Sequence, residues 1–213
     1  EISLAHRGVL FLDEFPEFSR SVLENLRQPL EDGVVTVSRA QGSLTFPARF
    51  ILVASQNPCP CGYASDADRE CVCSPGQIIK YRHKVSGPIL DRIDLHVEVP
   101  RLAFEKLANS EGAESSAVIR QRIERARSAQ EQRLSQHGIL TNSEMPPLLV
   151  RAYCVLDSAS QQLIKQAVDS LHLSARSFHR LLKVSRTIAD IAGEENILLA
   201  HLAEALQYRP RTE

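Results

Sequence analysis

The stretch GVLFLDE at residues 8–14 decides the fold of this chain. Four apolar residues in succession, without the alternation of a half-exposed strand, predict a strand buried on both faces of a parallel sheet. Asp13 and Glu14 then lie at the carboxyl end of that strand. Parallel strands require a crossover, and apolar residues recur at helical spacing between Pro16 and Gly33, where a helix would supply one.

The next segment predicts a β-hairpin and further elements of an α/β domain. Residues 34–38 and 43–46 are strand-like and are joined by the sequence RAQG, in which Gly42 supplies the turn. Apolar strands are expected at residues 50–54 and 95–99, and a short helix is expected between them at residues 76–84. Together these elements predict an α/β domain over residues 1–103.

The remainder of the chain has a helical pattern. Residues 117–136 carry five arginines and few apolar anchors, which indicates a solvated connecting helix. Three more helices are predicted, with Asp157 and Ser174 as N-caps and Gly193 as a C-cap, at residues 157–171, 174–191 and 198–208. We therefore expect a helical linker at residues 104–142 and a small helical domain at residues 143–213.

Composition restricts the class of protein. The 25 Lys and Arg residues nearly balance 26 Asp and Glu residues, so a polyanionic partner would have to be held by a local patch of charge. The sequence contains no apolar run of about 18 residues, the length that a membrane-spanning helix needs. Its first residues, Glu1-Ile2-Ser3, do not resemble a signal segment. We expect a cytoplasmic location.

Asp13 and Glu14 have the form of a Walker B element, an apolar strand that ends in two acids. Phosphoryl transfer needs a metal ion between the terminal phosphates and a positioned water molecule, and adjacent carboxylates can hold the one and orient the other. Asp13 is the candidate ligand of Mg²⁺, and Glu14 is the candidate base that polarises water. The structural alternative is an apolar strand that simply ends in two acids.

Four of the five cysteines form two pairs, Cys59-Pro60-Cys61 and Cys71-Val72-Cys73. Four thiolates fill a tetrahedral structural Zn²⁺ site, and a short loop without a core of its own gains most from such a metal. The spacing within each pair is one residue rather than the more usual two, so free thiols and disulfides remain alternatives. The fifth cysteine, Cys154, is expected in a helical core.

Several motifs in succession resemble those of the ComM family of magnesium-chelatase-like AAA+ ATPases, and more distantly the chelatase motor subunit and the replicative MCM helicases. The matching stretches are HRGVLFLDEF, VLENLRQPLEDG, VTVSRA, FPARFILVASQNPCPCG, SGPILDRIDLHVEVP and LSARSFHRLLKVSRTIADI. The resemblance implies a partial AAA+ core at residues 1–103, followed by an all-helical lid domain. That core would hold a parallel sheet of the P-loop type, a presensor hairpin and a cysteine-rich insert at residues 59–80.

The resemblance also implies roles for single residues in an ATP site. Asn57 corresponds to sensor 1, a polar side chain that reaches the γ-phosphate or its attacking water. Arg92 corresponds to the arginine finger, which a neighbouring subunit inserts into such a site. Arg176 corresponds to sensor 2, another arginine that reaches the nucleotide. ATP and Mg²⁺ are the implied ligands.

The implied whole protein is a hexameric ring that acts on single-stranded or branched DNA, as a branch-migration helicase in natural transformation and recombination. Arg39, at the tip of the hairpin, is the candidate contact with DNA phosphates. One alternative is the motor of a magnesium-chelatase complex, in which a separate subunit inserts Mg²⁺ into a porphyrin. Another alternative is a nonenzymatic interaction module.

One element of the family pattern is missing from the sequence. A phosphate-binding loop needs Gly-Lys followed by Ser or Thr, and none of the nine glycines precedes a lysine. In the family that loop lies on the N-terminal side of the position matched by Glu1. Its absence is therefore better explained by truncation of the chain than by loss of the motif through mutation. We expect the parent protein to be an ATPase and this chain alone to be inactive.

Overall fold

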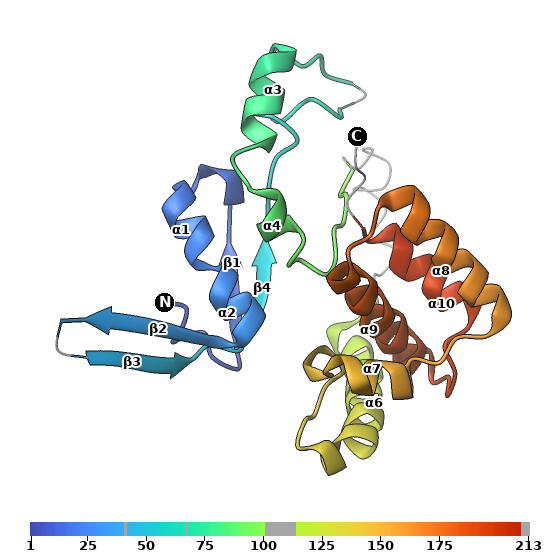
Figure 1. Ribbon diagram of the computed structural model, residues 1–213. Coiled ribbons are helices and arrows are strands. Elements are labelled where there is room, and N and C mark those ends of the chain that lie inside the picture. The colour runs from blue at the N-terminus through green and yellow to red at the C-terminus, as the bar shows by residue number, and fades with distance from the viewer. Residues whose placement is uncertain (41, 67, 101–113, 210–213) are drawn as a thin grey trace. The chain divides into compact units, whose positions relative to one another are not determined.

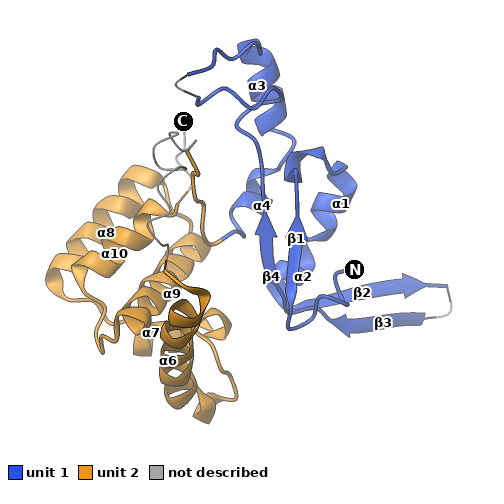
Figure 2. Ribbon diagram, turned by 180° about the vertical axis from the view of Figure 1, so that it is seen from behind, with its two compact units in different colours: residues 1–93 blue, residues 94–213 orange. Residues whose placement is uncertain are grey.

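The computed structural model describes residues 1–40, 42–66, 68–100 and 114–209. The chain forms two compact units, residues 1–93 and residues 94–213 (Figure 2). Each unit has a hydrophobic core of its own.

A small parallel sheet forms the centre of the first unit (Figure 1). Strand β1, Val9–Leu12, pairs in parallel with β4, Ile51–Ala54, so that Leu12 lies beside Ala54. The hydrogen bonding continues beyond the strands, because the N–H of Ser55 donates to the carbonyl of Leu12 at 3.0 Å. The predicted parallel arrangement is confirmed, and the carboxyl ends of both strands meet at one edge of the sheet.

The segment after β1 is built of short helices rather than of the single helix that the apolar spacing predicts. A 3-10 turn, Phe15–Glu17, leads to α1, Arg20–Asn25, which is capped by the Ser19 hydroxyl. Helix α2, Arg27–Asp32, follows directly and ends at Gly33. The φ of Gly33 is 67°, the left-handed conformation that glycine adopts most easily at a helix end.

The two faces of the sheet differ in exposure. Leu10 and Leu12 pack against a core of buried side chains, namely Phe15, Leu23, Leu26, Val85 and Ile89. On the other face the exposed fractions are 59% for Val9 and Phe11, 65% for Ile51 and 45% for Val53. The expectation of a strand buried on both faces is therefore wrong within the described residues, which cover only one face of the sheet.

The predicted hairpin is confirmed. Strand β2, Val34–Arg39, pairs antiparallel with β3, Gly42–Pro47, so that Arg39 lies opposite Gly42. Because side chains on a strand point alternately to opposite sides, the hairpin has two different faces. One face carries the hydroxyl pairs Thr36–Thr45 and Ser38–Ser43, whose oxygens lie 3.2 and 2.9 Å apart, respectively. The other carries the apolar side chains Val35, Val37, Leu44 and Phe46.

Two helices complete the first unit. Helix α3, Pro75–Arg82, matches the helix expected at residues 76–84. It begins at Ser74, whose hydroxyl accepts from the N–H of Gln77 in a capping box. The short helix α4, Gly87–Leu90, brings Ile89 into the core beside the sheet.

The strand expected at residues 95–99 is not formed. These residues belong to the second unit, where the N–H of His96 donates to the carbonyl of Tyr208 at 2.8 Å. A strand needs a neighbour with which to form a ladder, and the described residues offer none at this position. The apolar residues 95–99 alone predict a strand, but a strand also needs a neighbouring strand with which to pair.

The second unit is helical, as predicted. Its helices are α6, Ser116–Leu134; α7, Pro147–Tyr153; α8, Ser158–Leu171; α9, Ala175–Ala192; and α10, Leu199–Gln207. Two 3-10 turns, Ser135–His137 and Asn142–Glu144, connect α6 to α7. The side chains of Asp157 and Ser174 cap α8 and α9, and Gly193 ends α9 with a φ of 79°. Helix α7 is not predicted by the sequence, because seven residues are too few for a periodic pattern.

Helix α9 lies at the centre of this unit. Its buried Leu181 and Leu182 pack with Leu134 of α6 and Leu202 of α10 in one hydrophobic cluster. Cys154 belongs to the same cluster, as expected, and burial raises the pKa of its thiol to about 11. The core explains why α9 has the most regular spacing of apolar residues in this part of the sequence.

A buried ion-pair network crosses the same core. The Asp190 carboxylate accepts from Arg186 Nε at 3.1 Å, from Asn142 Nδ2 at 2.8 Å and from the Arg133 guanidinium. Arg186 also donates to two backbone carbonyls just beyond α9. Because the loss of one partner would leave a buried charge unpaired, the network holds α6, α9 and the turn at residues 142–144 in one arrangement.

Gly33 provides a test of this description of the first unit. A Cβ added there would lie 2.8 Å from Arg49 Cγ, and the left-handed backbone would be strained. We expect Gly33→Ala to destabilise the unit by about 1–2 kcal/mol. Gly76→Ala is the matched control, since a Cβ at Gly76 meets nothing within 4 Å and should stabilise by about 0.5 kcal/mol. Native-state hydrogen exchange of the β1 and β4 amides measures both changes, and equal effects would contradict the assigned role of Gly33.

Candidate functional site

Asp13 directly follows β1, and Ser55 directly follows β4, so the parallel register brings these two residues together. The Ser55 hydroxyl donates to Asp13 Oδ1. The same oxygen accepts from the N–H of Glu14 at 3.1 Å. Within the described residues no hydrogen bond uses Asp13 Oδ2, which leaves one oriented carboxylate oxygen of the kind that binds a hard divalent cation.

Glu14 has a left-handed backbone, with a φ of 51° and a ψ of 49°. For a residue other than glycine this conformation costs about 1–2 kcal/mol. Hydrogen bonds to Ser55 hold it in place, since the N–H of Glu14 lies 3.2 Å from Ser55 Oγ and the N–H of Phe15 donates to the Ser55 carbonyl at 2.8 Å. Strained residues of this kind concentrate at functional sites, which fits an exposed acid at a strand end.

Asn57 lies two residues beyond Ser55 and is exposed. Its backbone lies near the hydroxyl of Tyr81, which comes from α3. Tyr81 is only 5% exposed, and burial raises the pKa of its hydroxyl. The structure therefore brings Asn57 to the same edge of the sheet as the acid pair.

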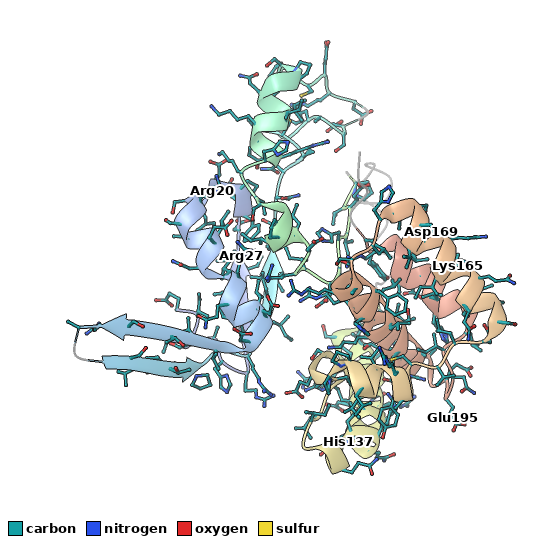
Figure 3. All side chains as sticks on the ribbon, viewed as in Figure 1. Arg20, Arg27, His137, Lys165, Asp169 and Glu195 are labelled. Atoms are coloured by element: carbon teal, nitrogen blue, oxygen red, sulfur yellow. The ribbon has the colours of Figure 1, made fainter. Side chains whose placement is uncertain are left out.

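Basic side chains gather next to the loop that follows the acid pair. Lys84 donates to both carboxylate oxygens of Glu17 at 2.9 Å. A shallow depression of about 460 Å³ at this place is lined by Pro16, Glu17, Phe18, Arg20, Lys80, His83 and Lys84. Arg20, labelled in Figure 3, lies in the first turn of α1. The depression holds three Lys and Arg side chains and one carboxylate, so it adds positive charge beside the acids.

Arg92 follows α4 and is held within the first unit. Its Nε donates to Glu31 at 3.1 Å, a second guanidinium nitrogen pairs with the same carboxylate, and a third donates to the carbonyl of Pro88 at 2.5 Å. Its side chain is 9% exposed. The structure thus brings Arg92 together with Glu31 of α2, a partner that the sequence motif does not indicate.

Arg176 lies in the first turn of α9, after the N-cap Ser174. It is exposed and belongs to the second unit, whereas Asp13, Glu14, Asn57 and Arg92 belong to the first. Within the first unit, the structure brings together the acid pair and Asn57.

The four cysteines at residues 59–73 form a compact cluster. Their sulfur atoms all lie within 4.8 Å of one another, and the three closest pairs are 3.4, 3.6 and 3.7 Å apart. A tetrahedral Zn²⁺ with metal–sulfur bonds of about 2.3 Å requires sulfur atoms about 3.8 Å apart. This is the one group in the described part of the chain with metal-ligand spacing, and its donor set fits zinc.

Thiols placed so close together cannot all titrate alike. A hydrogen bond from the backbone of Tyr63 lowers the pKa of Cys61 to about 6, whereas burial raises that of Cys73 to about 12. No disulfide joins the cysteines of the described residues. A bound metal would keep all four sulfur atoms deprotonated, because thiols lose their protons when they coordinate a metal ion.

Arg39 lies at the last paired position of β2 and is exposed. Because side chains alternate along β2, Arg39 lies on the side of Val35 and Val37, opposite the hydroxyl face that the Ser38–Ser43 pair begins. The structure thus confirms Arg39 at the end of a two-stranded arm whose polar face is open to solvent.

Comparisons with known proteins agree with this geometry. The family described as magnesium chelatase, subunit ChlI, matches residues 1–107, and its C-terminal companion, ChlI C-terminal, matches residues 113–209. The competence protein ComM of Haemophilus influenzae is 46% identical over 210 residues, and the uncharacterized protein YifB of Escherichia coli is 43% identical over 211 residues. Each of these two matches covers 98% of this chain. The DNA replication licensing factor mcm-6 of Caenorhabditis briggsae is 21% identical over 97% of the chain and 25% of its own length.

An acid pair at the end of a parallel strand, a neighbouring polar strand end and a helical C-terminal unit are consistent with the AAA+ class of proteins. The chain belongs to the magnesium-chelatase-like family, and to its ComM type. It spans 40% of the length of the ComM and YifB relatives. None of the helices in the described part of the chain is long and apolar enough to cross a membrane.

Three residues of the site were not predicted from the sequence: Ser55, Tyr81 and Glu31. A signal for Ser55 exists, since it follows its strand as Asp13 follows the partner strand, and the register of a parallel pair then sets them side by side. Tyr81 and Glu31 have no such signal, because they lie near segments 24 and 61 residues away in sequence, respectively.

Ser55→Ala should loosen the loop at the acid pair, because it removes the hydroxyl that holds both Asp13 and the Glu14 amide. We expect solvent exchange of the Glu14 amide to rise about tenfold, the effect of one lost hydrogen bond. Ser21→Ala, which removes an exposed hydroxyl of α1, is the control and should leave that amide unchanged. NMR exchange measurements decide the matter, and an unchanged Glu14 amide in Ser55→Ala would remove Ser55 from the site.

Proposed function

We propose that this chain is the motor portion of a ring-forming AAA+ ATPase that acts on DNA, as a ComM-like branch-migration helicase in natural transformation or recombination. The observation that carries the proposal is the meeting of Asp13, Glu14, Ser55 and Asn57 at the carboxyl edge of a parallel sheet. The proposed assembly is a hexameric ring of such chains in the cytoplasm.

The acid pair suits ATP hydrolysis. Asp13 would bind Mg²⁺ together with the Ser55 hydroxyl, because both offer oxygen ligands and one carboxylate oxygen is already oriented. When bound, Mg²⁺ neutralises charge on the terminal phosphates of ATP. Glu14 would orient and deprotonate the attacking water, and the Asn57 amide would hydrogen-bond that water or the γ-phosphate. Phosphate binding itself requires a Gly-Lys loop that this sequence does not contain.

Two arginines that do not lie at the acid pair, Arg92 and Arg176, would complete the proposed ATP site. Arg92 would act as the arginine finger toward a neighbouring subunit, exchanging Glu31 for phosphate oxygens. Arg176, at the start of α9, would reach the nucleotide as sensor 2. Both roles depend on assembly of subunits or units, and both belong to the proposal.

DNA is the proposed partner for two reasons. The relative with 46% identity is named a competence protein, and a more distant one is named a DNA replication licensing factor. The β2–β3 hairpin also presents Arg39 to solvent and, on its opposite face, a row of hydroxyl groups, and groups of both kinds contact phosphates without reading sequence. A motor that moves along DNA needs contacts of this kind.

A second candidate function is the motor of a magnesium-chelatase complex. The name of the matching family, magnesium chelatase subunit ChlI, favours it. That motor would use the same acid pair but would have no need of a DNA contact at Arg39. DNA binding by the longer protein therefore separates the two candidates.

The cysteine cluster is proposed to hold one structural Zn²⁺. Its four sulfur atoms have the spacing of a tetrahedral site, and the described residues from 59 to 74 contain no helix or strand. A metal would supply the stability that this insert cannot gain from a core of its own.

Elemental analysis of the chain purified without added metal tests the zinc site. We expect about one Zn²⁺ per chain, from four thiolate ligands. Cys71→Ser should lose the metal and loosen the insert while β1 and β4 stay paired, because the metal stabilises the insert and not the sheet. Cys154→Ala is the control and should keep the metal, since Cys154 lies in the core of the second unit. Less than about a tenth of an equivalent in the unaltered chain would refute the site.

Arg39→Ala tests the proposed DNA motor, and it is best made in the longer protein that contains this segment. Loss of one phosphate contact should weaken binding to a dT oligonucleotide and reduce the slope of log K against log salt by about one unit. Basal ATP hydrolysis should fall much less, because it depends on Asp13, Glu14 and Asn57. Fluorescence anisotropy at several salt concentrations gives the slope.

Two controls make the Arg39 result decisive. Glu14→Gln should abolish hydrolysis while leaving the salt slope of DNA binding unchanged. Arg20→Ala removes an arginine of the same unit that lies outside the hairpin, and should also leave the slope unchanged. Unchanged DNA binding by Arg39→Ala would remove the hairpin from the mechanism. No DNA binding by the unaltered protein would favour the chelatase-type motor.

A further inference from the structure

Arg92 is enclosed by its own chain, although an arginine finger has to reach a neighbouring subunit. Its Nε donates to Glu31 Oε2 at 3.1 Å, and its Nη2 pairs with the same oxygen. Its Nη1 donates to the carbonyl of Pro88 at 2.5 Å. Each guanidinium nitrogen is thus bonded within the first unit. The N–H groups that point at Glu31 become available to another anion only when this ion pair opens.

The backbone on both sides of the ion pair is fixed. Glu31 lies in α2, next to Leu30, which packs against the core of the first unit. Arg92 lies between α4, whose Ile89 is fully buried, and Ile93, which packs against the same core. The pair thus joins α2 to the segment after α4 (Figure 1). Because neither backbone can move without disturbing the core, the pair opens by rotation of the side chains alone.

The two partners differ in their access to water. The Arg92 side chain is 9% exposed, whereas that of Glu31 is 36% exposed. When the pair opens, the Glu31 carboxylate can be hydrated in place, and this access to water keeps the pair weak enough to be exchanged. The guanidinium needs a new acceptor, because an enclosed charge without a partner is costly. Such a pair persists in the free chain and opens when a stronger anion is offered to Arg92.

We propose that Glu31 is a latch for Arg92. It holds the guanidinium on its own chain until the phosphates of a nucleotide on the neighbouring subunit compete for the same N–H donors. This inference rests on the proposed ATPase function, in which Arg92 is the arginine finger. Glu31 touches neither the nucleotide nor the reacting atoms, so it is a positioning residue.

The latch makes the insertion of Arg92 depend on the charge of the nucleotide. The triphosphate of ATP offers more negative charge than the single carboxylate of Glu31, and phosphate oxygens can accept two parallel hydrogen bonds from a guanidinium. Exchange therefore favours phosphate when ATP is bound and the carboxylate when the site is empty. Because Glu31 and phosphate compete for one set of donors, weakening the latch should increase the fraction of inserted Arg92.

Glu31→Gln in the longer protein tests the direction of this effect, because it removes the charge and keeps the size and an oxygen acceptor. Hydrogen bonds to a charged group are about twice as strong as neutral ones, so we expect kcat for ATP to rise about fivefold. The increase should require Arg92. In an Arg92→Ala background, Glu31→Gln should therefore change kcat by less than about twofold.

Glu24→Gln is the matched control. Glu24 is another carboxylate of the first unit that accepts from an arginine, since it pairs with Arg27 at 2.8 Å. Its substitution should leave kcat unchanged. A general loss of structure in Glu31→Gln would instead lower kcat and the melting temperature together, which is opposite to the expected increase.

NMR of the 213-residue chain tests the latch without catalysis. The Nε–H of Arg92 is hydrogen-bonded to Glu31, so Glu31→Gln should raise its exchange with solvent about fivefold. Glu24→Gln should leave this exchange unchanged.

The outcomes separate this inference from the function on which it rests. A kcat that falls or stays unchanged in Glu31→Gln would overturn the latch, as would an equal rise in the Arg92→Ala background. Unchanged exchange of the Arg92 Nε–H would also overturn it. An unaltered longer protein that hydrolyses no ATP would overturn the proposed function and the latch with it, even if exchange showed that Glu31 holds Arg92.

Discussion

The parallel pairing of β1 with β4 is the constraint on which the rest of the first unit depends. Parallel strands carry their carboxyl ends to the same edge of a sheet, and the register of Leu12 with Ala54 makes Asp13 and Ser55 neighbours. The hydrogen bond between them then fixes the acid loop, including the left-handed Glu14. A register slip of one residue would separate Asp13 from Ser55 and would also turn the apolar side chains to the other face.

The sequence predicts local elements well because their causes are local. The strands, the hairpin and the long helices follow from apolar spacing, and the caps Ser174 and Gly193 follow from side-chain chemistry and backbone freedom at helix ends. The cysteine cluster also follows from spacing, since two pairs on one short insert can meet only in a compact loop. In each case the residues that decide the structure lie within a few positions of one another.

Elements that need a distant partner are predicted less well. Residues 95–99 have the composition of a strand but pair with no strand in the described chain, and the second face of the sheet has no cover there. Arg92 is recognised by its motif, yet its partner Glu31 lies 61 residues earlier. Tyr81 belongs to no motif, and its position beside Asn57 follows only from the packing of α3. The candidate acids were therefore predictable, whereas the contacts that hold them were not.

The order in which the first unit folds follows from the separation of β1 and β4 along the chain. The helices α1 and α2 and the β2–β3 hairpin lie between them and involve only near neighbours, so they can form early. Pairing β1 with β4 must close the long loop that contains these elements, and its entropic cost is met only when the sheet forms. The acid edge is thus assembled in a late step. A ligand that binds there stabilises the paired sheet over the open chain, so the proposed nucleotide and metal would also promote folding of the first unit.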